Sequence, residues 1–448
     1  MNAERCKSRR AFLKGAGMVA GSGVFASALA GRAQTQAVAG QNADSQPPQF
    51  GGFGVTPENS ETFWATARSH FSLDPGLNFL NNGAYGPTPD PIVKTREYYN
   101  QFLAKDPTNN FRMKELAETR AALAGLLNAK DGEVSITHST TEGMNIFAHG
   151  LDWKAGDEAI IGDQEHFGAV EPYKTLEQRY GIKIVTVKLA VPAQSAGQVV
   201  EAYAKAFTPR TRVLVVSHVS YVTGLVAPLR ELADLAHKNG ALISVDGAQS
   251  FGVLPVDVAA ADIDHFSGAG QKWLLAGTGT GVNYIRKDLQ AKIWPLYGYD
   301  DPDLKVSPRY ERSGQLGIPA AAGLRAAVQF HEAIGTPLIA ARAKDLGRHV
   351  RESVAAIPGA KVISSPDAAL QGNLNVFTLP LDLPVQQVVK ALSDRRFIVR
   401  SVSFSDYNAL RVSTHYYNTA EQIDRLFAVL ADLSKNPQLL PAVEKRAS

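Results

Sequence analysis

Short apolar runs alternate with amphipathic helical patterns along the middle of this chain, and that alternation constrains its fold most strongly. The apolar runs cover residues 133–137, 158–162, 212–219 and 241–246, and helical patterns follow the first three at 141–151, 168–180 and 228–240. Apolar runs of this length are typical of strands that are covered on both faces, and their alternation with helices is typical of βαβ units. We therefore predict an α/β fold with a doubly wound, mostly parallel sheet.

The pattern changes after about residue 310. A long helical stretch at 320–335 leads into a shorter region of mixed character that ends in a helical pattern at 419–436. A folded part of roughly 390 residues favours two domains. We predict a large domain over residues 57–320, whose N-terminal segment could join the smaller one, and a small α+β C-terminal domain over residues 321–448.

Residues 1–30 have the features of a twin-arginine signal peptide. Arg9 and Arg10 lie in the pattern S-R-R-x-F-L-K, a mild glycine-rich apolar stretch follows, and Ala28–Ala30 gives the spacing of small residues at a cleavage site. The alternative, a basic tail beside a short membrane anchor, is disfavoured because the apolar stretch is short and rich in glycine. We expect export to the periplasm in a folded state by the Tat machinery.

Residues 31–56 lack periodicity and are rich in Gln, Ala, Gly and Pro, so we predict a linker. The signal carries five basic groups and one acid, and its removal changes the formal net charge of the chain from +3 to about −1. Without a dense basic stripe, the mature protein lacks the footprint of a nucleic-acid-binding protein. No later stretch has the length and apolarity of a membrane span.

The only cysteine, Cys6, lies in the predicted signal. A mature chain without cysteine has no disulfide, no thiolate nucleophile and no thiolate metal site. We predict no metal site of any kind.

Three motifs carry candidate chemistry, and each follows an apolar run, where ligands bind in open α/β sheets. In the first, "HSTTEGMN", Thr140 and Thr141 follow Ser139 at the start of a helical pattern. Hydroxyl groups and free backbone N–H groups at a helix N-terminus suit a phosphate. A plain N-cap would use the same residue types.

In the second motif, "SVDGAQS", Asp246 follows a buried run and Gln249 lies three residues further on. A carboxylate at this point can meet a cationic ring nitrogen, although it can also simply cap a turn before Gly247. In the third motif, "FSGAGQKWLLAGTGTG", Lys272 lies among small residues. Burial would lower its pKa and free an amine that condenses with an aldehyde. A lysine that extends from a strand end to solvent is the alternative.

A phosphate cradle, an acid for a pyridinium nitrogen and a buried lysine are together what pyridoxal 5'-phosphate requires. The ordered motifs that carry a family resemblance run from "LNFLNNGAYGPTP" through "STTEGMN", "EHFGAV", "SHVSYVTG", "VDGAQS" and "GQKWL" to "LRVSTHYYNT". In these motifs the chain resembles the class V aminotransferase family, which includes cysteine desulfurases and isopenicillin N epimerases. The resemblance implies a fold-type I transferase, a seven-stranded large domain and a homodimer with the active site at the subunit interface.

The resemblance also implies roles for individual residues. Lys272 would bind the cofactor as a Schiff base and move the substrate proton, Asp246 would pair with the pyridine nitrogen, and His166 would stack on the ring. Without the family context, His166 would more simply be a structural histidine. The remaining implied contacts are Gln249 to the ring hydroxyl, Thr140, Thr141, Gln271 and the partner-reaching Thr278 to the phosphate, and Arg411, with Arg400 as a second candidate, to the substrate carboxylate.

The chain departs from the family pattern at several positions. Gln271 and Ala269 replace the usual histidine and serine near the lysine, and Tyr221 stands where desulfurases usually have asparagine. The loop after Arg400 contains no cysteine, which rules out a desulfurase that carries a persulfide on the protein.

These observations predict an exported enzyme of amino-acid chemistry, aminotransferase-like or tailoring a siderophore. An exported, periplasmic family member that modifies pyoverdine siderophores has a similar length and layout. Epimerisation of the isopenicillin N epimerase type and cysteine-independent C–S lysis are alternatives, because fold and cofactor do not fix the reaction. A non-catalytic binding protein is the least favoured reading.

Overall fold

The computed structural model describes residues 47–108, 112–297, 307–314, 316–402, 404 and 407–441. The predicted signal at 1–30 and the predicted linker up to residue 46 lie outside the described residues. Within the described part, no helix is both long enough and apolar enough to cross a bilayer.

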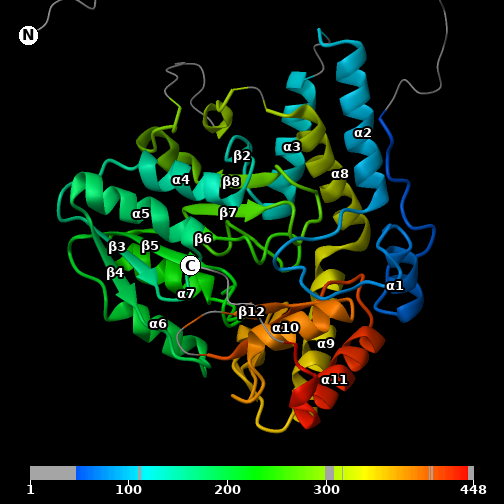
Figure 1. Cartoon of the computed structure of the whole chain (residues 1–448). Coiled ribbons are helices and arrows are strands. Elements are labelled where there is room, and N and C mark those ends of the chain that lie inside the picture. Colours follow the sequence, from blue (N-terminus) through cyan, green and yellow to red (C-terminus); the bar gives the residue numbers. More distant parts are fainter. Residues whose placement is uncertain are drawn as a thin grey trace, which may run out of the picture. The chain divides into compact units, whose positions relative to one another are not determined.

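A seven-stranded sheet forms the centre of the larger core, in the order β2-β8-β7-β6-β5-β3-β4 (Figure 1). Every strand is parallel to the others except β8, which pairs antiparallel with both β2 and β7. The prediction of a mostly parallel α/β sheet is therefore confirmed. The strands are β2 (Val134–Thr137), β3 (Glu158–Gly162), β4 (Lys183–Val187), β5 (Thr211–Ser217), β6 (Leu242–Asp246), β7 (His265–Ala269) and β8 (Gly281–Ile285).

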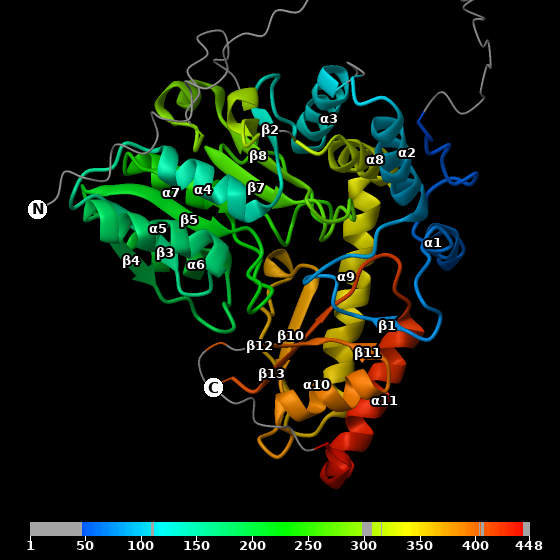
Figure 2. The ribbon, with the colours of Figure 1, turned by 45° about the horizontal axis from the view of Figure 1, so that its top comes forward.

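Helices cover both faces of this sheet, because successive strand residues point to opposite sides. Ile160 belongs to the apolar cluster that includes α7, and its neighbour Ile161 belongs to the cluster that includes α4 and α5. Helix α8 packs against α2 and α3, and Figures 1 and 2 show these three helices side by side. The helices are α1 (Glu61–Arg68), α2 (Asp90–Lys105), α3 (Arg112–Leu127), α4 (Thr140–Gly150), α5 (Phe167–Tyr180), α6 (Ala196–Ala204), α7 (Leu229–Lys238) and α8 (Ile318–Ile334).

A smaller antiparallel sheet follows, in the order β12-β13-β10-β9, with its own apolar cluster (Figure 2). Strand β1 (Asn78–Phe79), from early in the chain, pairs in parallel with β11 (Phe397–Ile398) from this region. The exact domain boundaries stay predictions. The remaining elements are β9 (Lys361–Val362), β10 (Leu374–Thr378), β12 (Arg400–Val402), β13 (Ala409–Ser413), α9 (Thr336–Ser353), α10 (Val385–Asp394) and α11 (Ala420–Lys435).

Local sequence signals explain where several of these helices begin and end. The side chain of Ser139 caps α4, and Thr419 with Gln422 forms a capping box at α11. Gly181 ends α5 in the left-handed conformation, with φ of 70°.

Residues 47–56, the described part of the predicted linker, form no helix or strand. They nevertheless contact the folded chain, because the ring centroid of Phe50 lies 4.6 Å from that of Phe330.

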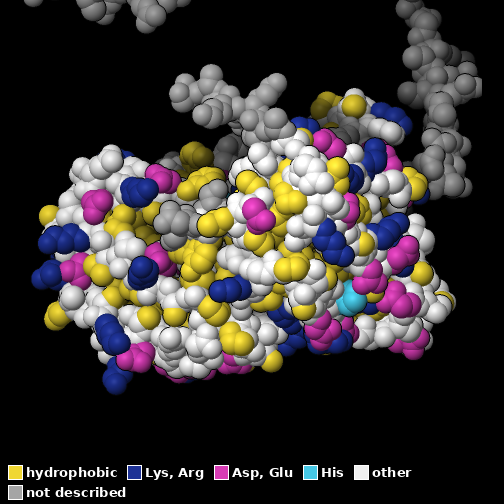
Figure 3. Space-filling model, turned by 60° about the horizontal axis from the view of Figure 1, so that its bottom comes forward, with side chains coloured by type: hydrophobic (Ala, Val, Ile, Leu, Met, Phe, Trp, Pro, Cys, Tyr) yellow, Lys and Arg dark blue, Asp and Glu magenta, His cyan; other side chains and the backbone are white. Residues whose placement is uncertain are grey.

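On the face shown in Figure 3, positive and negative side chains are interspersed rather than gathered by sign. This face therefore offers no basic surface of the kind that binds nucleic acid.

Candidate active site

The carboxyl ends of four parallel strands deliver several of the predicted site residues to one edge of the large sheet. Thr140 follows β2, His166 follows β3, Asp246 ends β6 and Lys272 follows β7. Ligands bind at this edge in open α/β sheets. The charge of Lys272 perturbs the pKa of both His166 and Asp246, so the structure brings these three residues together.

A tight turn with several contacts holds the backbone of Lys272. The N–H of Ala276 donates to the carbonyl of Gly270 at 2.8 Å, and Leu275 has a φ of 63°, a strained value for leucine. The side chain of Asn82 donates to the Lys272 carbonyl at 3.1 Å. A Cβ at Gly86 would lie 2.1 Å from the same carbonyl oxygen, so only glycine fits there.

Burial lowers the pKa of Lys272 to about 8. Asp246 opposes this shift, whereas Arg411 and Arg400 add to it. In a substantial fraction of the molecules, the Lys272 side chain is therefore a neutral amine near physiological pH. Such an amine can attack a carbonyl group or accept a proton.

Two carboxyl groups lie in this part of the molecule, and Asp246 is the one that acts on the amine of Lys272. Asp246 accepts a hydrogen bond from the N–H of Ala248 at 2.8 Å, and burial raises its pKa while Lys272 lowers it. Glu165, which sequence reasoning missed, is more strongly affected: burial raises its pKa to about 8, although it accepts a hydrogen bond from Ser217 Oγ. Burial therefore favours the protonated form of Glu165 near neutral pH, whereas Lys272 favours the ionised form of Asp246.

His166 is held as a neutral ring beside Tyr221. Its Nδ1 accepts from the N–H of Gly168 at 3.1 Å, and the ring of Tyr221 meets it edge-on with centroids 5.1 Å apart. Burial, followed by the charges of Lys272 and the two arginines, lowers the pKa of His166 to about 4. A neutral, oriented imidazole is suited to stacking on a flat heteroaromatic ring.

The predicted phosphate region contains buried polar atoms that lack a partner among the described residues, namely Thr140 Oγ1 and Gln271 Oε1. Thr140 is at the first turn of α4, while Ser139 Oγ already accepts from the N–H of Glu142 at 3.2 Å. Buried polar atoms without partners are rare in folded proteins and indicate a ligand or water. The arrangement fits a phosphate group at the start of α4.

The other two predicted phosphate contacts are more exposed. Thr141 lies on the surface, close enough to Gly168 that a Cβ there would be 2.7 Å from Thr141 Oγ1. Thr278 is also exposed, and its carbonyl accepts from Arg96 at 3.0 Å. Of these two, only Thr141 thus lies on the His166 side of the site.

Gln249 is engaged within the protein at both ends of its side chain. Its Nε2 donates to the carbonyl of Gly83 at 2.9 Å, and its Oε1 accepts from the indole of Trp273 at 2.8 Å. One N–H of the amide remains for the predicted contact to a ring hydroxyl. Gln249 therefore also connects the loop that contains Gly83 to the segment that carries Lys272. The sequence did not indicate this role.

Arg411 and Arg400 lie opposite each other on β13 and β12. Arg411 is 1% exposed; it donates to the carbonyl of Tyr221 at 3.0 Å and to Asn81 at 3.4 Å. Arg400 is exposed. Sequence reasoning missed Asn81 and Asn82, although this polar pair directly after an apolar run was the available signal.

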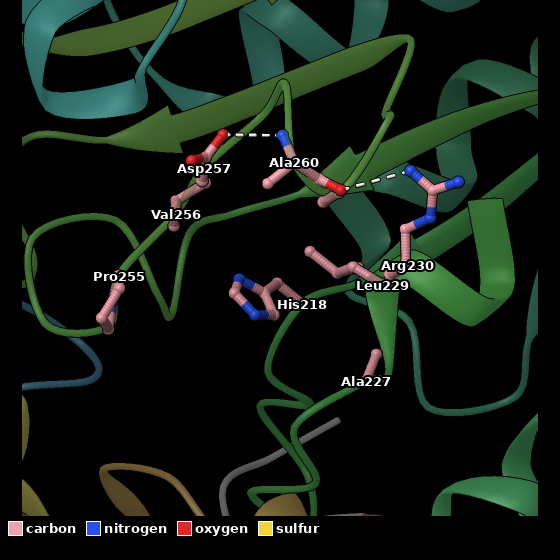
Figure 4. A pocket seen from close by; sticks show the side chains of 9 residues that line it. His218, Ala227, Leu229, Arg230, Pro255, Val256, Asp257 and Ala260 are labelled. Atoms are coloured by element: carbon pink, nitrogen blue, oxygen red, sulfur yellow. Dashed lines mark hydrogen bonds between the residues drawn. The ribbon is translucent and has the colours of Figure 1, made fainter. Parts of the chain in front are cut away.

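A separate pocket, of about 280 Å³, lies between the start of α7 and the segment 255–261 (Figure 4). His218 points into it, but none of the predicted site residues lines it. Its two charged side chains already have partners: Arg230 binds Asp234, and Asp257 accepts from the N–H of Ala260.

Comparisons with known proteins identify the family of this chain. The family model for aminotransferase class-V matches residues 79–426. The isopenicillin N epimerase of Amycolatopsis lactamdurans is 32% identical over 403 residues, which cover 84% of this chain and 99% of that protein. A probable cysteine desulfurase of Methanothermobacter thermautotrophicus is 29% identical, over 80% of this chain and 94% of the relative.

Solved structures are similar over most of the chain. A mutant of C-DES with glycine covalently linked to the PLP cofactor superimposes with a TM-score of 0.74 at 26% identity, covering 82% of this chain and 99% of that one. The cysteine desulfurase CsdA of Escherichia coli also gives 0.74, at 25% identity, covering 84% and 99%. The fold-type I prediction is confirmed, and the chain belongs to the class V aminotransferase family, whose enzymes depend on pyridoxal phosphate.

Proposed function

We propose that this protein is an exported enzyme that acts on the amino group of an amino acid or an amino-acid-derived metabolite, in an aminotransferase-like or siderophore-tailoring reaction. One observation carries the proposal. Asp246, at the carboxyl edge of the large sheet, and the carboxylate-binding candidate Arg411, on β13 of the small sheet, both act electrostatically on Lys272.

When bound, pyridoxal phosphate supplies an aldehyde for the amine of Lys272 or of the substrate and a ring that takes up electrons released at the substrate Cα. Asp246 would hold a negative charge toward the ring nitrogen, and His166 would stack on the ring. Thr140, Thr141 and Gln271 would hold the phosphate. Gln249 would contribute its remaining N–H to the ring hydroxyl.

Two residues then act on the substrate. Arg411 binds the carboxylate with its planar fork, which fixes the orientation of the Cα–H bond. The amine of Lys272, with its lowered pKa, removes the Cα proton and returns it. Arg400 adds a second positive charge on the solvent side.

Homodimer formation and export are parts of the same proposal. Thr278 is exposed, and in the proposed homodimer it would contact the phosphate of the second subunit. A cofactor bound within a folded site is most simply loaded before export, and a twin-arginine route transports folded proteins. Exchange of Arg9 and Arg10 for lysine should leave the protein in the cytoplasm, which cell fractionation would detect.

Two other reactions are supported by similarity and use the same residues. Epimerisation is favoured by the 32% identity to an isopenicillin N epimerase. A C–S lyase reaction is favoured by the similarity to C-DES, which is described as a cystine C-S lyase. The cysteine-free mature chain disfavours only persulfide transfer on the protein.

The first test is the visible absorption spectrum of the purified protein beside Lys272→Ala, with the exposed Lys238→Ala as control. A yellow, borohydride-reducible band that only Lys272→Ala loses would support the assignment. A protein that stays colourless with added pyridoxal phosphate would overturn it.

Product analysis then separates the reactions. Transamination requires a keto-acid acceptor, whereas epimerisation exchanges the Cα hydrogen with deuterated water and conserves the amino acid. Elimination releases a thiol or persulfide together with ammonia and a keto acid. Exchange accompanied by formation of the opposite epimer would support the epimerase alternative over our first choice.

A further inference from the structure

The pocket of about 280 Å³ beside His218 lies apart from the candidate active site, and none of the residues to which the sections above give a role lines it (Figure 4). Its wall combines the first turn of a helix, a buried histidine and several apolar side chains. The apolar lining residues are Ala227, Leu229, Pro255, Val256, Ala260 and Ala261.

The start of α7 supplies hydrogen-bond donors at this pocket. Leu229 and Arg230, the first two residues of the helix, line it. Pro228 precedes the helix and provides no side-chain cap. The backbone N–H groups of Leu229, Arg230 and Glu231 have no acceptor among the described residues. Free N–H groups at a helix N-terminus, together with the helix dipole, favour an anion.

His218 brings a second unsatisfied polar group to the same place. The residue is 7% exposed, its ring points into the pocket, and its Nδ1 has no hydrogen-bond partner among the described residues (Figure 4). Burial lowers the pKa of His218 to about 4, so the ring is neutral and carries one N–H donor. A buried polar side chain without a partner indicates a ligand or water.

The backbone fixes His218 beside the helix. The loop between β5 and α7 folds back on itself, so that the N–H of Ala227 donates to the His218 carbonyl at 2.8 Å. The N–H of His218 in turn donates to the carbonyl of Asp246 at 2.9 Å. The imidazole and the first turn of α7 are therefore held at one pocket, and a single backbone hydrogen bond joins this pocket to Asp246 of the candidate active site.

The charged side chains at the pocket leave the N–H groups of α7 available. Asp257 is the one carboxylate among the lining residues, and both of its oxygens are occupied. Its Oδ1 accepts from the N–H of Ala260 at 2.7 Å, and its Oδ2 accepts from the side chain of Asn128 at 2.9 Å. The guanidinium of the exposed Arg230 binds Asp234.

We propose that this pocket binds a small aliphatic carboxylate. Its oxygens accept hydrogen bonds from the first N–H groups of α7 and from His218, and its chain contacts the apolar residues of the wall. The apolar lining favours such an organic anion over inorganic phosphate, which gains nothing from those contacts. This anion site is separate from Arg411 and does not depend on the proposed function.

The test uses the enzyme with its cofactor and two probes of equal chain length, hexanoate and n-hexanol. Calorimetric titration should show that hexanoate binds at least about tenfold more tightly, because only its carboxylate accepts charge-assisted hydrogen bonds. Ala260→Phe, which adds a ring to the pocket wall, should weaken hexanoate binding by at least about tenfold. Ala259→Phe, at the exposed neighbouring position outside the pocket lining, should leave it unchanged.

Hexanoate could also bind at Arg411, so the titration is repeated with Arg411→Gln, in which binding at the pocket should persist. Loss of binding in Arg411→Gln, or full binding in Ala260→Phe, would overturn the inference. Equal affinity for the two probes, or no binding of hexanoate up to about 10 mM, would overturn it as well.

A second measurement does not depend on how well Ala260→Phe folds. In the NMR spectrum of protein with isotope-labelled histidine, hexanoate should shift the ring resonances of His218, which His218→Gln identifies. His218 resonances that stay in place while hexanoate binds would contradict the proposal.

Discussion

Arg400 and Arg411 face each other in register on β12 and β13, and in the described residues neither forms an ion pair with a carboxylate. Two opposed guanidinium groups repel each other, and burial makes this more costly for Arg411. Such a pair is stabilised when an anion binds between the two groups.

Arg411→Lys should therefore raise KM for a carboxylate-bearing substrate by about ten- to hundredfold, because lysine loses the planar fork, worth about 1.5–3 kcal/mol. Steady-state kinetics would measure this. Arg400→Lys, at the exposed position, should change KM by less than about fivefold. A larger effect at Arg400 than at Arg411 would reverse the assignment of the two residues.

Because the hydroxyl of Thr140 has no partner among the described residues, its removal should affect cofactor binding without lowering the stability of the fold. Thr140→Val removes an oxygen that has no partner among the described residues, so the cofactor-free protein should be no less stable. Its affinity for pyridoxal phosphate should fall, as measured by fluorescence titration. Ser139→Ala, which removes the helix cap, should instead cost about 1 kcal/mol in urea unfolding. Unchanged cofactor affinity in Thr140→Val would argue against the phosphate site.

The pKa of Lys272 predicts a pH dependence in the cofactor-free protein. Labelling of Lys272 by an amine-specific reagent should rise with pH and reach half its maximum near pH 8. Asp246→Asn should move this midpoint to lower pH, since Asp246 raises the pKa, and Arg411→Gln should move it to higher pH. Peptide mapping by mass spectrometry would follow the label, and a midpoint near 10.5 would contradict a buried amine.

The same shift affects stability in a defined direction. The folded-state pKa lies below the ordinary value of 10.5, so between about pH 8 and 10.5 the unfolded chain binds the additional proton. This group therefore adds to the free energy of unfolding as the pH rises through that window. Lys272→Met should remove that increment, which urea unfolding at a series of pH values would detect.

Gly86 should be essential for the position of the lysine. A methyl group there would lie 2.1 Å from the Lys272 carbonyl and 2.3 Å from Leu275 Cδ2. Gly86→Ala should therefore lower cofactor occupancy and the thermal midpoint. Gly125 lies within α3, and a methyl group added there would meet no atom of another segment within 4 Å. Gly125→Ala should therefore stabilise the protein by about 0.5–1 kcal/mol. A Gly86→Ala protein with normal occupancy would show that the turn at Lys272 can move.

Most of the large sheet could be predicted from the sequence because its strands are buried on both faces. The runs at 158–162 and 241–246, for example, became β3 and β6 almost without change of bounds. Lys272, Asp246 and Thr140 could be predicted for the same reason, since each directly follows such a run. The antiparallel insertion of β8 could not, because a buried strand has the same composition in either direction.

Contacts between segments far apart in the chain were decided only by the tertiary structure. Asn82 reaches Lys272 because β1 pairs with β11, and no local pattern encodes that pairing. The engagement of Gln249 by Gly83 and Trp273, and the pocket between His218 and Val256, likewise arise from packing. The sequence by itself thus determined which residues end the strands and what chemistry they carry. The tertiary structure determined their partners, since hydrogen bonds and burial depend on distances that only the folded chain sets.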